Sequence, residues 1–302
     1  MNPTLLASLI IVIGASAWGV YWVPVREIEA TGVVDGWAVV IFNIPALIIA
    51  LIVPFFLGGV SARANRLIMI AGAMAGAGLA FYAMGLVLTT VVRATLLFYL
   101  TPIWSTVLAI FILGERPGVA RWAALALGIA GLGLTLGASP ADIASGFGSG
   151  EAVALFSGFV WAIAAVTIRK IGETEPPSRA IDARLVMHQF IWVIIFAALG
   201  SAALGHAAPT VAQSISAISP LVIGFSIFIL ISLYAIFWAV GRLSPGRSGL
   251  LMMSEVVVAV ITASLLLPEE AMNAREWIGA ALIVSAGVVE VAGGSQDQPS
   301  PT

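Results

Sequence analysis

Residues 101–116 read TPIWSTVLAIFILGER, and residues 255–270 read EVVVAVITASLLLPEE. Each stretch is a long apolar run with small residues spaced through it, and each closes with Leu, then Gly or Pro, then Glu. The two stretches begin 154 positions apart, and Glu115 and Glu269 are separated by the same number of positions. A repeated segment of this kind indicates that one structural unit occurs twice in the chain.

The composition indicates an integral membrane protein. Of the 302 residues, 61% are hydrophobic and only 9% are charged, and the mean hydropathy is +1.10. Soluble domains carry roughly 25% charged residues, so this chain lacks the charge needed to cover a water-facing surface. Membrane barrels show alternating segments of about ten residues, whereas the apolar runs here are longer and continuous. We therefore expect an all-α membrane protein.

Several classes of chemistry are disfavoured by the residues that the chain lacks. It contains no cysteine, which excludes disulfides and thiolate chemistry. Its single lysine, Lys170, lies in the context IRKIGE, which does not fit the Gly-Lys-Ser/Thr of a phosphate-binding loop. His188 and His206 have no HExxH-like context. We expect no ATP use, no cofactor, no metal, no nucleic-acid partner and no enzymatic activity.

Ten windows of the sequence are long and apolar enough to span a membrane as a helix, which needs about 20 mostly apolar residues. They are residues 4–24, 36–57, 67–88, 93–113, 119–138, 151–171, 184–204, 219–240, 247–267 and 275–294. The first window has no small-residue cleavage site after a short apolar core, so we interpret it as a retained helix.

The basic residues predict the orientation, because cytoplasmic loops carry an excess of Lys and Arg. With the N-terminus inside, the cytoplasmic loops hold Arg63, Arg66, Arg116, Arg121, Arg169, Lys170, Arg179, Arg184, Arg242 and Arg247. The outer loops hold only Arg26, Arg93 and Arg275. The even number of helices then predicts both termini in the cytoplasm, and we expect a bacterial-type cytoplasmic (inner) membrane.

The repeat extends along most of the chain. Aligned pairs, with their offsets, are Trp18–Trp161 at 143, Asn43–Gln189 at 146 and Tyr82–Tyr234 at 152. Offsets that rise steadily are what small loop insertions produce, whereas chance similarity scatters them. Because each half has an odd number of helices, the halves are inverted relative to one another. Inverted repeats characterise secondary transporters, whose substrate site lies near the midplane at the repeat interface.

These features divide the chain into four segments. The first five-helix repeat is predicted over residues 1–138 and the second over residues 151–292. Residues 139–150 form a Gly/Ser-rich outer connector between them, and residues 293–302 form a polar, Pro-rich tail that we expect to be disordered.

Several motifs occur once in each half. The first half supplies Trp18-Gly19, Pro102, Gly114-Glu115 and Gly131; the second supplies Trp161, Glu255, Glu269 and Gly287. This pattern, over nearly all of residues 4–292, resembles the drug/metabolite transporter superfamily in its ten-helix EamA branch. The resemblance implies a transporter of two five-helix repeats. The interior aromatic residues further resemble those of the YddG-type aromatic amino-acid exporters.

Two departures from the family pattern stand out. The family's Arg-Phe pair in the second helix of each half is replaced by Asn43-Ile44 and Gln189-Phe190. Pro268 replaces the second terminal glycine. The usual intramembrane arginine is therefore absent at both positions.

Eight interior side chains are candidate substrate-binding residues. They are Trp18, Asn43, Tyr82, Tyr99, Trp161, Gln189, Tyr234 and Glu255. Interior Tyr and Trp offer apolar surface with one polar atom, and an intramembrane carboxylate is costly unless it is paired, protonated or facing a cavity. Structural roles stay open for all eight, since a Tyr can bond a neighbouring carbonyl and Asn or Gln can bond across helices. Trp37, Trp122 and Trp277, at helix ends, are interpreted as interfacial anchors.

The prediction is a secondary transporter in the lipid bilayer that exports small amphipathic metabolites. Amino acids are favoured, aromatic ones first, and helices 3, 4, 8 and 9 move to expose a central cavity alternately. A multidrug or cation efflux transporter is the alternative within this class. A non-transporting membrane protein, such as a lipid scramblase or a partner-binding subunit, is the alternative outside it. A compact ten-helix unit can work as a monomer.

Overall fold

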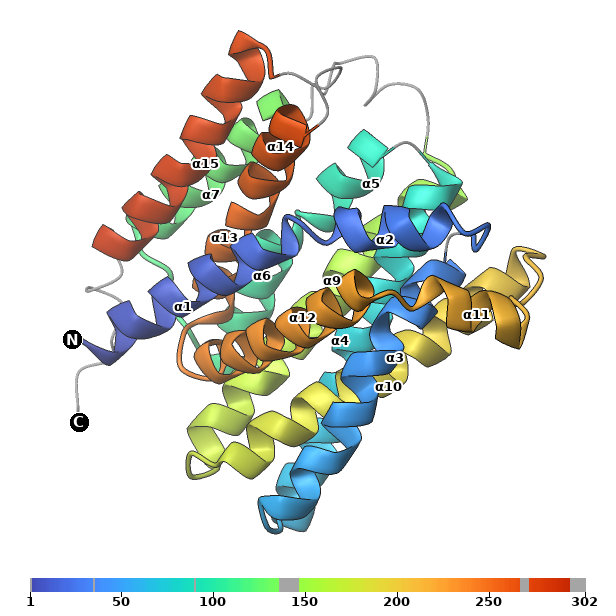
Figure 1. Cartoon of the computed structure of the whole chain (residues 1–302). Coiled ribbons are helices and arrows are strands. Elements are labelled where there is room, and N and C mark those ends of the chain that lie inside the picture. Colours follow the sequence, from blue (N-terminus) through green and yellow to red (C-terminus); the bar gives the residue numbers. More distant parts are fainter. Residues whose placement is uncertain (1, 35, 90, 136–146, 267–271, 294–302) are drawn as a thin grey trace.

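The computed structural model describes residues 2–34, 36–89, 91–135, 147–266 and 272–293, and structural statements below refer to these ranges. Within them the chain forms helices and no strand (Figure 1). The predicted all-α membrane fold is confirmed. Pro268, Glu269 and most of the predicted connector and tail lie outside the described residues.

The helices follow one another in two series. The first is α1 (Pro3–Trp18), α2 (Trp22–Glu29), α3 (Gly36–Ile52), the short 3-10 helix η1 (Val53–Phe56), α4 (Ala62–Leu88), α5 (Val91–Phe98), α6 (Thr101–Leu113) and α7 (Val119–Thr135). The second is α9 (Ser149–Thr174), α10 (Arg179–Ala203), α11 (Val211–Ala217), α12 (Pro220–Val240), α13 (Pro245–Met252), α14 (Ser254–Leu266) and α15 (Ala274–Gly293).

The predicted number of membrane helices agrees with the structure. Nine apolar spans among the described residues are long enough to cross a membrane, and α7 is a shorter apolar helix of 17 residues. The predicted window for α7 extends to residue 138, and its end lies outside the described ranges. The ten windows thus correspond to the nine spans and α7.

Among the described residues, three of the spans are broken into two α-helices each. The break between α5 and α6 falls at Tyr99, next to Thr101-Pro102. The sequence predicts a bend here, because a proline lacks the backbone N–H that a continuous helix would bond. Pro102 lies in the first turn of α6, where its missing N–H removes no helix hydrogen bond. The breaks between α1 and α2, after Trp18, and between α13 and α14, at Met253, are not predicted by the sequence windows.

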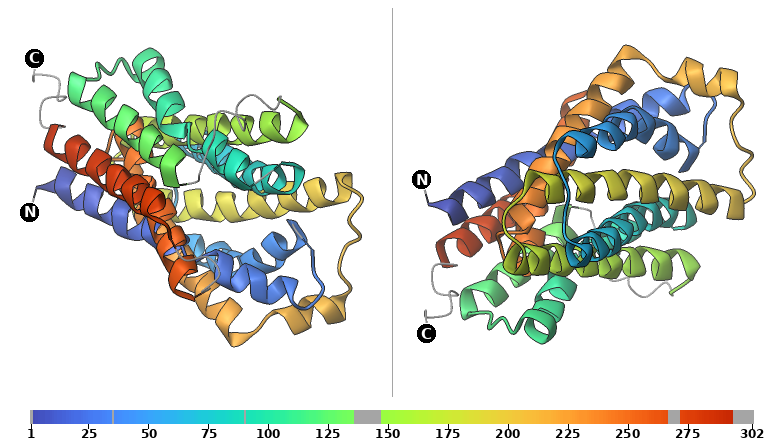
Figure 2. Two further views of the ribbon diagram at one scale, coloured as in Figure 1. Left: turned by 90° about the horizontal axis from the view of Figure 1, so that it is seen from above. Right: turned by 90° about the horizontal axis from the view of Figure 1, so that it is seen from below.

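The two series run in opposite directions through the bundle. Figure 2 shows α1 starting at the side where α15 ends, whereas α9, the first helix of the second series, runs the other way. We call the end of the bundle that holds Pro3 and Gly293 the terminal face. The cytoplasmic location of this face and the exact repeat boundaries stay predictions.

The repeat-related helices α4 and α12 are packed unequally against their neighbours. In the first half, α4 lies closely along α9 and α10. A Cβ added at Gly76 of α4 would lie 2.7 Å from the Cβ of Trp192, and one at Gly72 would collide with the Cβ of His188. Gly224 of α12 follows Gly72 by the same 152 positions that separate Tyr82 from Tyr234, and an added Cβ there meets nothing within 4 Å. The helix of the second half is therefore held less tightly by its neighbours.

Two arginines that charge counting assigned to loops lie inside the bundle. Arg121 of α7 is 3% exposed, and its Nε donates to Glu290 of α15 at 2.7 Å. Its Nη2 also donates to the Ser244 hydroxyl at 2.8 Å. Arg247 of α13 is 5% exposed and donates to the Ser8 hydroxyl of α1 at 3.0 Å. The assignment of both to loops was wrong, because polar partners on neighbouring helices stabilise these guanidinium groups in the interior.

Candidate functional site

The helix breaks of the two halves meet inside the bundle. Tyr99, at the break between α5 and α6, is 5% exposed. It packs in one apolar cluster with Leu250, Met253 and Val256, which surround the break between α13 and α14. At a helix break, backbone N–H and C=O groups lose the hydrogen bonds that they make within a continuous helix. Membrane proteins contain such breaks where the backbone is buried in protein or lines a cavity. The centre of the candidate site is therefore the pair of breaks.

Three of the predicted site residues gather around these breaks. Glu255, in the first turn of α14, interacts electrostatically with the hydroxyls of Tyr99 and Tyr82. The Tyr99 hydroxyl faces this carboxylate without a hydrogen bond of normal geometry. The Tyr82 hydroxyl lies 3.0 Å from the hydroxyl of Thr95, and its ring lies 4.5 Å from that of Phe98. The structure thus brings one carboxylate and two phenols together from α4, the α5–α6 break and α14.

The break in the first span lies against the same group. A Cβ added at Gly19, directly after α1, would lie 2.7 Å from the carbonyl oxygen of Glu255. Trp18 precedes this glycine and stacks on Tyr21 with the ring centroids 5.6 Å apart. Gly19 of the Trp18-Gly19 pair therefore allows the end of α1 to contact the start of α14. A larger residue at position 19 would displace one of these two helices.

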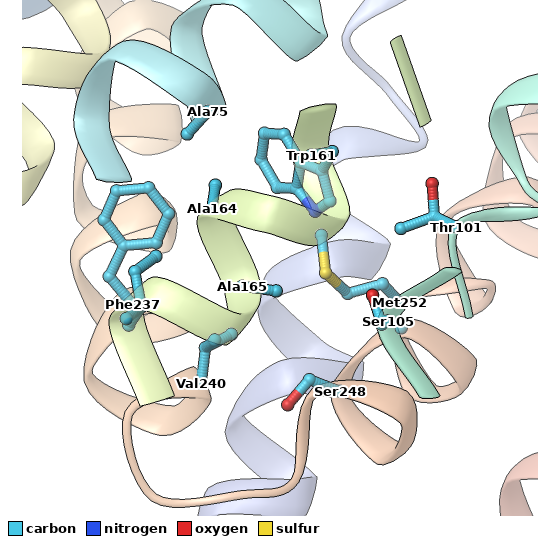
Figure 3. A pocket seen from close by; sticks show the side chains of 12 residues that line it. Ala75, Thr101, Ser105, Trp161, Ala164, Ala165, Phe237, Val240, Ser248 and Met252 are labelled. Carbon is cyan, nitrogen blue, oxygen red and sulfur yellow. The ribbon is translucent and has the colours of Figure 1, made fainter. Parts of the chain in front are cut away.

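A narrow cavity lies between the halves near these breaks (Figure 3). Its lining comes from α4, α6, α9, α12 and α13 and consists of Ala75, Thr101, Ser105, Trp161, Ala164, Ala165, Ile168, Phe237, Val240, Ser248, Gly249 and Met252. Every lining side chain is uncharged, and the free volume is about 10 Å³. This is close to the minimum that holds one water molecule, so a larger occupant requires the helices to separate.

Trp161 is the predicted site residue that lines this cavity. It lies at the centre of α9, and α4 approaches it closely, since a Cβ added at Gly78 would lie 3.2 Å from the Cβ of Trp161. The indole shares the cavity wall with the thioether of Met252. Together they provide an apolar, polarizable surface.

Sequence reasoning missed the two serines of the lining, Ser105 and Ser248. Ser105 follows Thr101 by four positions, so both lie on one face of α6. That spacing next to the predicted bend is the signal that could have identified Ser105. Ser248 has no comparable signal in the sequence.

The remaining candidates lie elsewhere in the bundle. Asn43, 1% exposed, donates from Nδ2 to the carbonyl oxygen of Val39 in its own helix at 2.7 Å. Gln189 is 1% exposed, and its Oε1 has no hydrogen-bond partner among the described residues. Tyr234 of α12 packs against the main core and interacts electrostatically with Asp182. None of these three residues lines the cavity.

The described residues offer no metal site. No group of three or more His, Cys, Asp or Glu side chains within these ranges is arranged to hold a metal ion. At the helix breaks the polar groups are hydroxyls and the carboxylate of Glu255, whereas the buried arginine groups lie near the terminal face.

The described residues form a membrane bundle of two series of helices with breaks around an interior site. The profile of the EamA-like transporter family matches residues 5–137 and again residues 148–289. The chain therefore belongs to the EamA-like transporter family, with two EamA domains, and is a membrane transporter of the drug/metabolite type.

The comparison with solved structures agrees with this fold. A solved structure described only as "Crystal structure of protein" superposes with a TM-score of 0.70 at 21% sequence identity, covering 94% of this chain and 98% of that chain. At this identity the likeness concerns the fold alone. No curated protein matches the chain by sequence.

Proposed function

We propose that this chain exports small amphipathic metabolites, most favourably aromatic amino acids, by alternating access through the site at the helix breaks. The observation that carries the proposal is the uncharged cavity walled by Trp161 and Met252, next to the group of Tyr82, Tyr99 and Glu255. Apolar pockets with a few convergent polar groups are typical of small-molecule sites.

The chemistry of the site fits a molecule that is apolar at one end and polar at the other. An aromatic side chain can stack on the indole of Trp161, where offset or edge-to-face ring contacts are favourable. Glu255, beside the Tyr99 hydroxyl, offers the negative charge that an ammonium group requires. Trp18, Asn43, Gln189 and Tyr234 stay proposed contributors that act when the helices move.

The unequal packing of the halves supports alternating access. The close contacts of α4 at Gly72 have no counterpart at Gly224 of α12. Inverted repeats allow the two halves to exchange these arrangements, which opens the site to the opposite side of the membrane. We propose that the spans containing α4, α6, α12 and α14 carry this motion, with cytoplasmic termini in a bacterial-type cytoplasmic membrane.

The proposal is tested by counterflow of labelled phenylalanine in proteoliposomes. Burial of a large apolar side chain is worth about 1.5–3 kcal/mol, so Trp161→Ala should weaken apparent affinity about tenfold or more. Trp122→Ala is the matched control, because this tryptophan is 47% exposed at a helix end, and it should leave counterflow unchanged.

The competitors decide between substrate classes. Competition by unlabelled amino acids supports the proposal, whereas competition by cationic dyes alone assigns the chain to multidrug efflux. Folded wild-type protein without any counterflow overturns the amino-acid proposal and favours a scramblase or a partner-binding subunit.

A further inference from the structure

Serine and threonine hydroxyls inside the described part of this bundle are in general hydrogen bonded. Thr106 donates to the carbonyl oxygen of Pro102 at 2.8 Å, and Thr135 donates to that of Gly131 at 2.9 Å. Such bonds to a carbonyl one turn earlier are the usual way for Ser and Thr to be satisfied in an apolar helix. An interior hydroxyl that makes no such bond therefore requires a separate explanation.

Ser105 and Ser248 are the exceptions. They are 0% and 1% exposed, and in the described part of the chain no other Ser or Thr hydroxyl is both buried and without a hydrogen-bond partner. Both line the same cavity, Ser105 from α6 and Ser248 from α13. Figure 3 shows Trp161, Met252 and the two serines around the same space. Two buried hydroxyls without a hydrogen-bond partner, one from each half, thus belong to residues that line the same cavity.

The surroundings of the serines favour a negatively charged group. Ser248 lies in the first turn of α13, and Ser105 lies just beyond the first turn of α6. The N-terminal end of a helix carries a partial positive charge. On α13, Arg247 is buried, and Gly246 lies against the guanidinium of Arg121. The lining contains no acidic side chain, so an ammonium group finds no counter-charge there.

We propose that Ser105 and Ser248 form the subsite for the carboxylate of the transported molecule. This inference rests on the proposed function, and it separates the two ends of the substrate: the hydroxyls donate to the carboxylate, and Trp161 contacts the apolar side chain. Hydrogen bonds to an ionised acceptor are stronger than those to a neutral one. The serines therefore determine specificity for molecules that carry a carboxylate.

The size of the cavity is consistent with a subsite rather than a complete binding site. Its free volume of about 10 Å³ has room for a small polar group, while the rest of the substrate requires α6 and α13 to move apart. In this structure the two serine hydroxyls make no hydrogen bond. A substrate carboxylate therefore does not have to displace another partner when it binds them.

The experiment compares competitors of phenylalanine counterflow that differ in one group. Phenylpropionate keeps the carboxylate without the amine, and phenethylamine keeps the amine without the carboxylate. The variants are Ser105→Ala, Ser248→Ala and both together, with Ser285→Ala as control because Ser285 is exposed on α15 and donates to the carbonyl of Ala281.

In the double variant we expect phenylalanine and phenylpropionate to bind about tenfold more weakly or worse, and phenethylamine to compete as in the wild type. Ser105→Thr, which keeps the hydroxyl, should recover part of the loss. Because neither hydroxyl supports the fold, the alanine variants should melt at or above the wild-type temperature.

Three results overturn the inference. An equal loss for all three competitors indicates a general packing role, and unchanged affinities indicate no role. A lower melting temperature of the alanine variants indicates that the hydroxyls are structural. These results leave wild-type phenylalanine counterflow intact, whereas its absence in the wild type overturns the proposed function and the inference with it.

Discussion

The ion pair of Arg121 and Glu290 makes a quantitative prediction about stability. The two groups lie 2.7 Å apart and are 3% and 2% exposed, so water screens their attraction weakly. Removal of one partner of such a pair is strongly destabilising, by about 3–5 kcal/mol, because a charge stays buried without its counter-ion. Glu290→Gln keeps the shape and one acceptor oxygen, and we expect a loss of about 3 kcal/mol.

Removal of both charges should cost less stability than removal of either one. Replacement of a buried ion pair by apolar residues of similar volume is often neutral or stabilising. The double variant Arg121→Met with Glu290→Leu should therefore be more stable than either single variant. Relative to the sum of the two single losses, we expect a coupling energy of about 3 kcal/mol. Arg121 also donates to Ser244, and this bond is lost in both variants that remove the guanidinium.

The assay is equilibrium unfolding in mixed micelles of a denaturing and a mild detergent, followed by tryptophan fluorescence. The control is Glu173→Gln, which breaks the Arg169–Glu173 pair at 2.9 Å with side chains that are 26% and 40% exposed. Exposed pairs are worth about 0–1 kcal/mol, so this variant should stay close to the wild type. The reasoning would be refuted if the stability lost in the double variant equalled the sum of the two single losses. It would also be refuted if Glu290→Gln lost no more stability than the control.

Two further predictions concern close helix contacts. Gly76→Ala places a methyl group 2.7 Å from the Cβ of Trp192, and we expect a loss of about 1–3 kcal/mol in the same unfolding assay. Gly133→Ala, where an added Cβ meets nothing within 4 Å, is its control, and equal stability of the two variants contradicts the prediction. Gly19→Ala places a methyl group 2.7 Å from the carbonyl oxygen of Glu255; it should slow counterflow while the protein still folds, and unchanged rates count against a role of this contact.

The sequence predicted the number of membrane helices and the duplication because both depend on local properties. An apolar stretch of about 20 residues is a helix in lipid whatever surrounds it. The bend at Tyr99 was also predictable, because Pro102 cannot supply the backbone N–H that a continuous helix needs there. These features follow from length, hydropathy and proline chemistry.

The other breaks depend on contacts between distant segments. The residues around Met253, between α13 and α14, include no proline or glycine that marks a break. In the structure, the hydroxyl of Ser254 donates to the carbonyl oxygen of Val12 in α1 at 3.1 Å. A contact with a residue this far away in the chain leaves no local signature. The buried Arg247 likewise depends on Ser8 of α1, and charge counting cannot detect such a partner.

The candidate site was predictable in its residue types and only partly in its arrangement. Tyr82 and Tyr234 occupy equivalent positions in the predicted repeats, yet Tyr82 interacts electrostatically with Glu255 and Tyr234 with Asp182. Equivalent positions have different neighbours because the two halves are packed differently. Ser105 was missed because a serine in a membrane helix usually bonds its own backbone, and only the three-dimensional structure shows where it does not.

The contrast between Gly72 and Gly224 has an energetic consequence for the transport cycle. If the halves were identical in sequence, the two access states would be equally populated, and each would hold half of the molecules. Here α4 is closely packed at Gly72 and α12 is not at Gly224, so the resting population is biased toward one state. A ligand that arrives at the disfavoured side binds with an apparent affinity reduced by the fraction of molecules open to it. Substitutions at Gly72 or Gly224 therefore alter sidedness, with the intrinsic affinity of the site left unchanged.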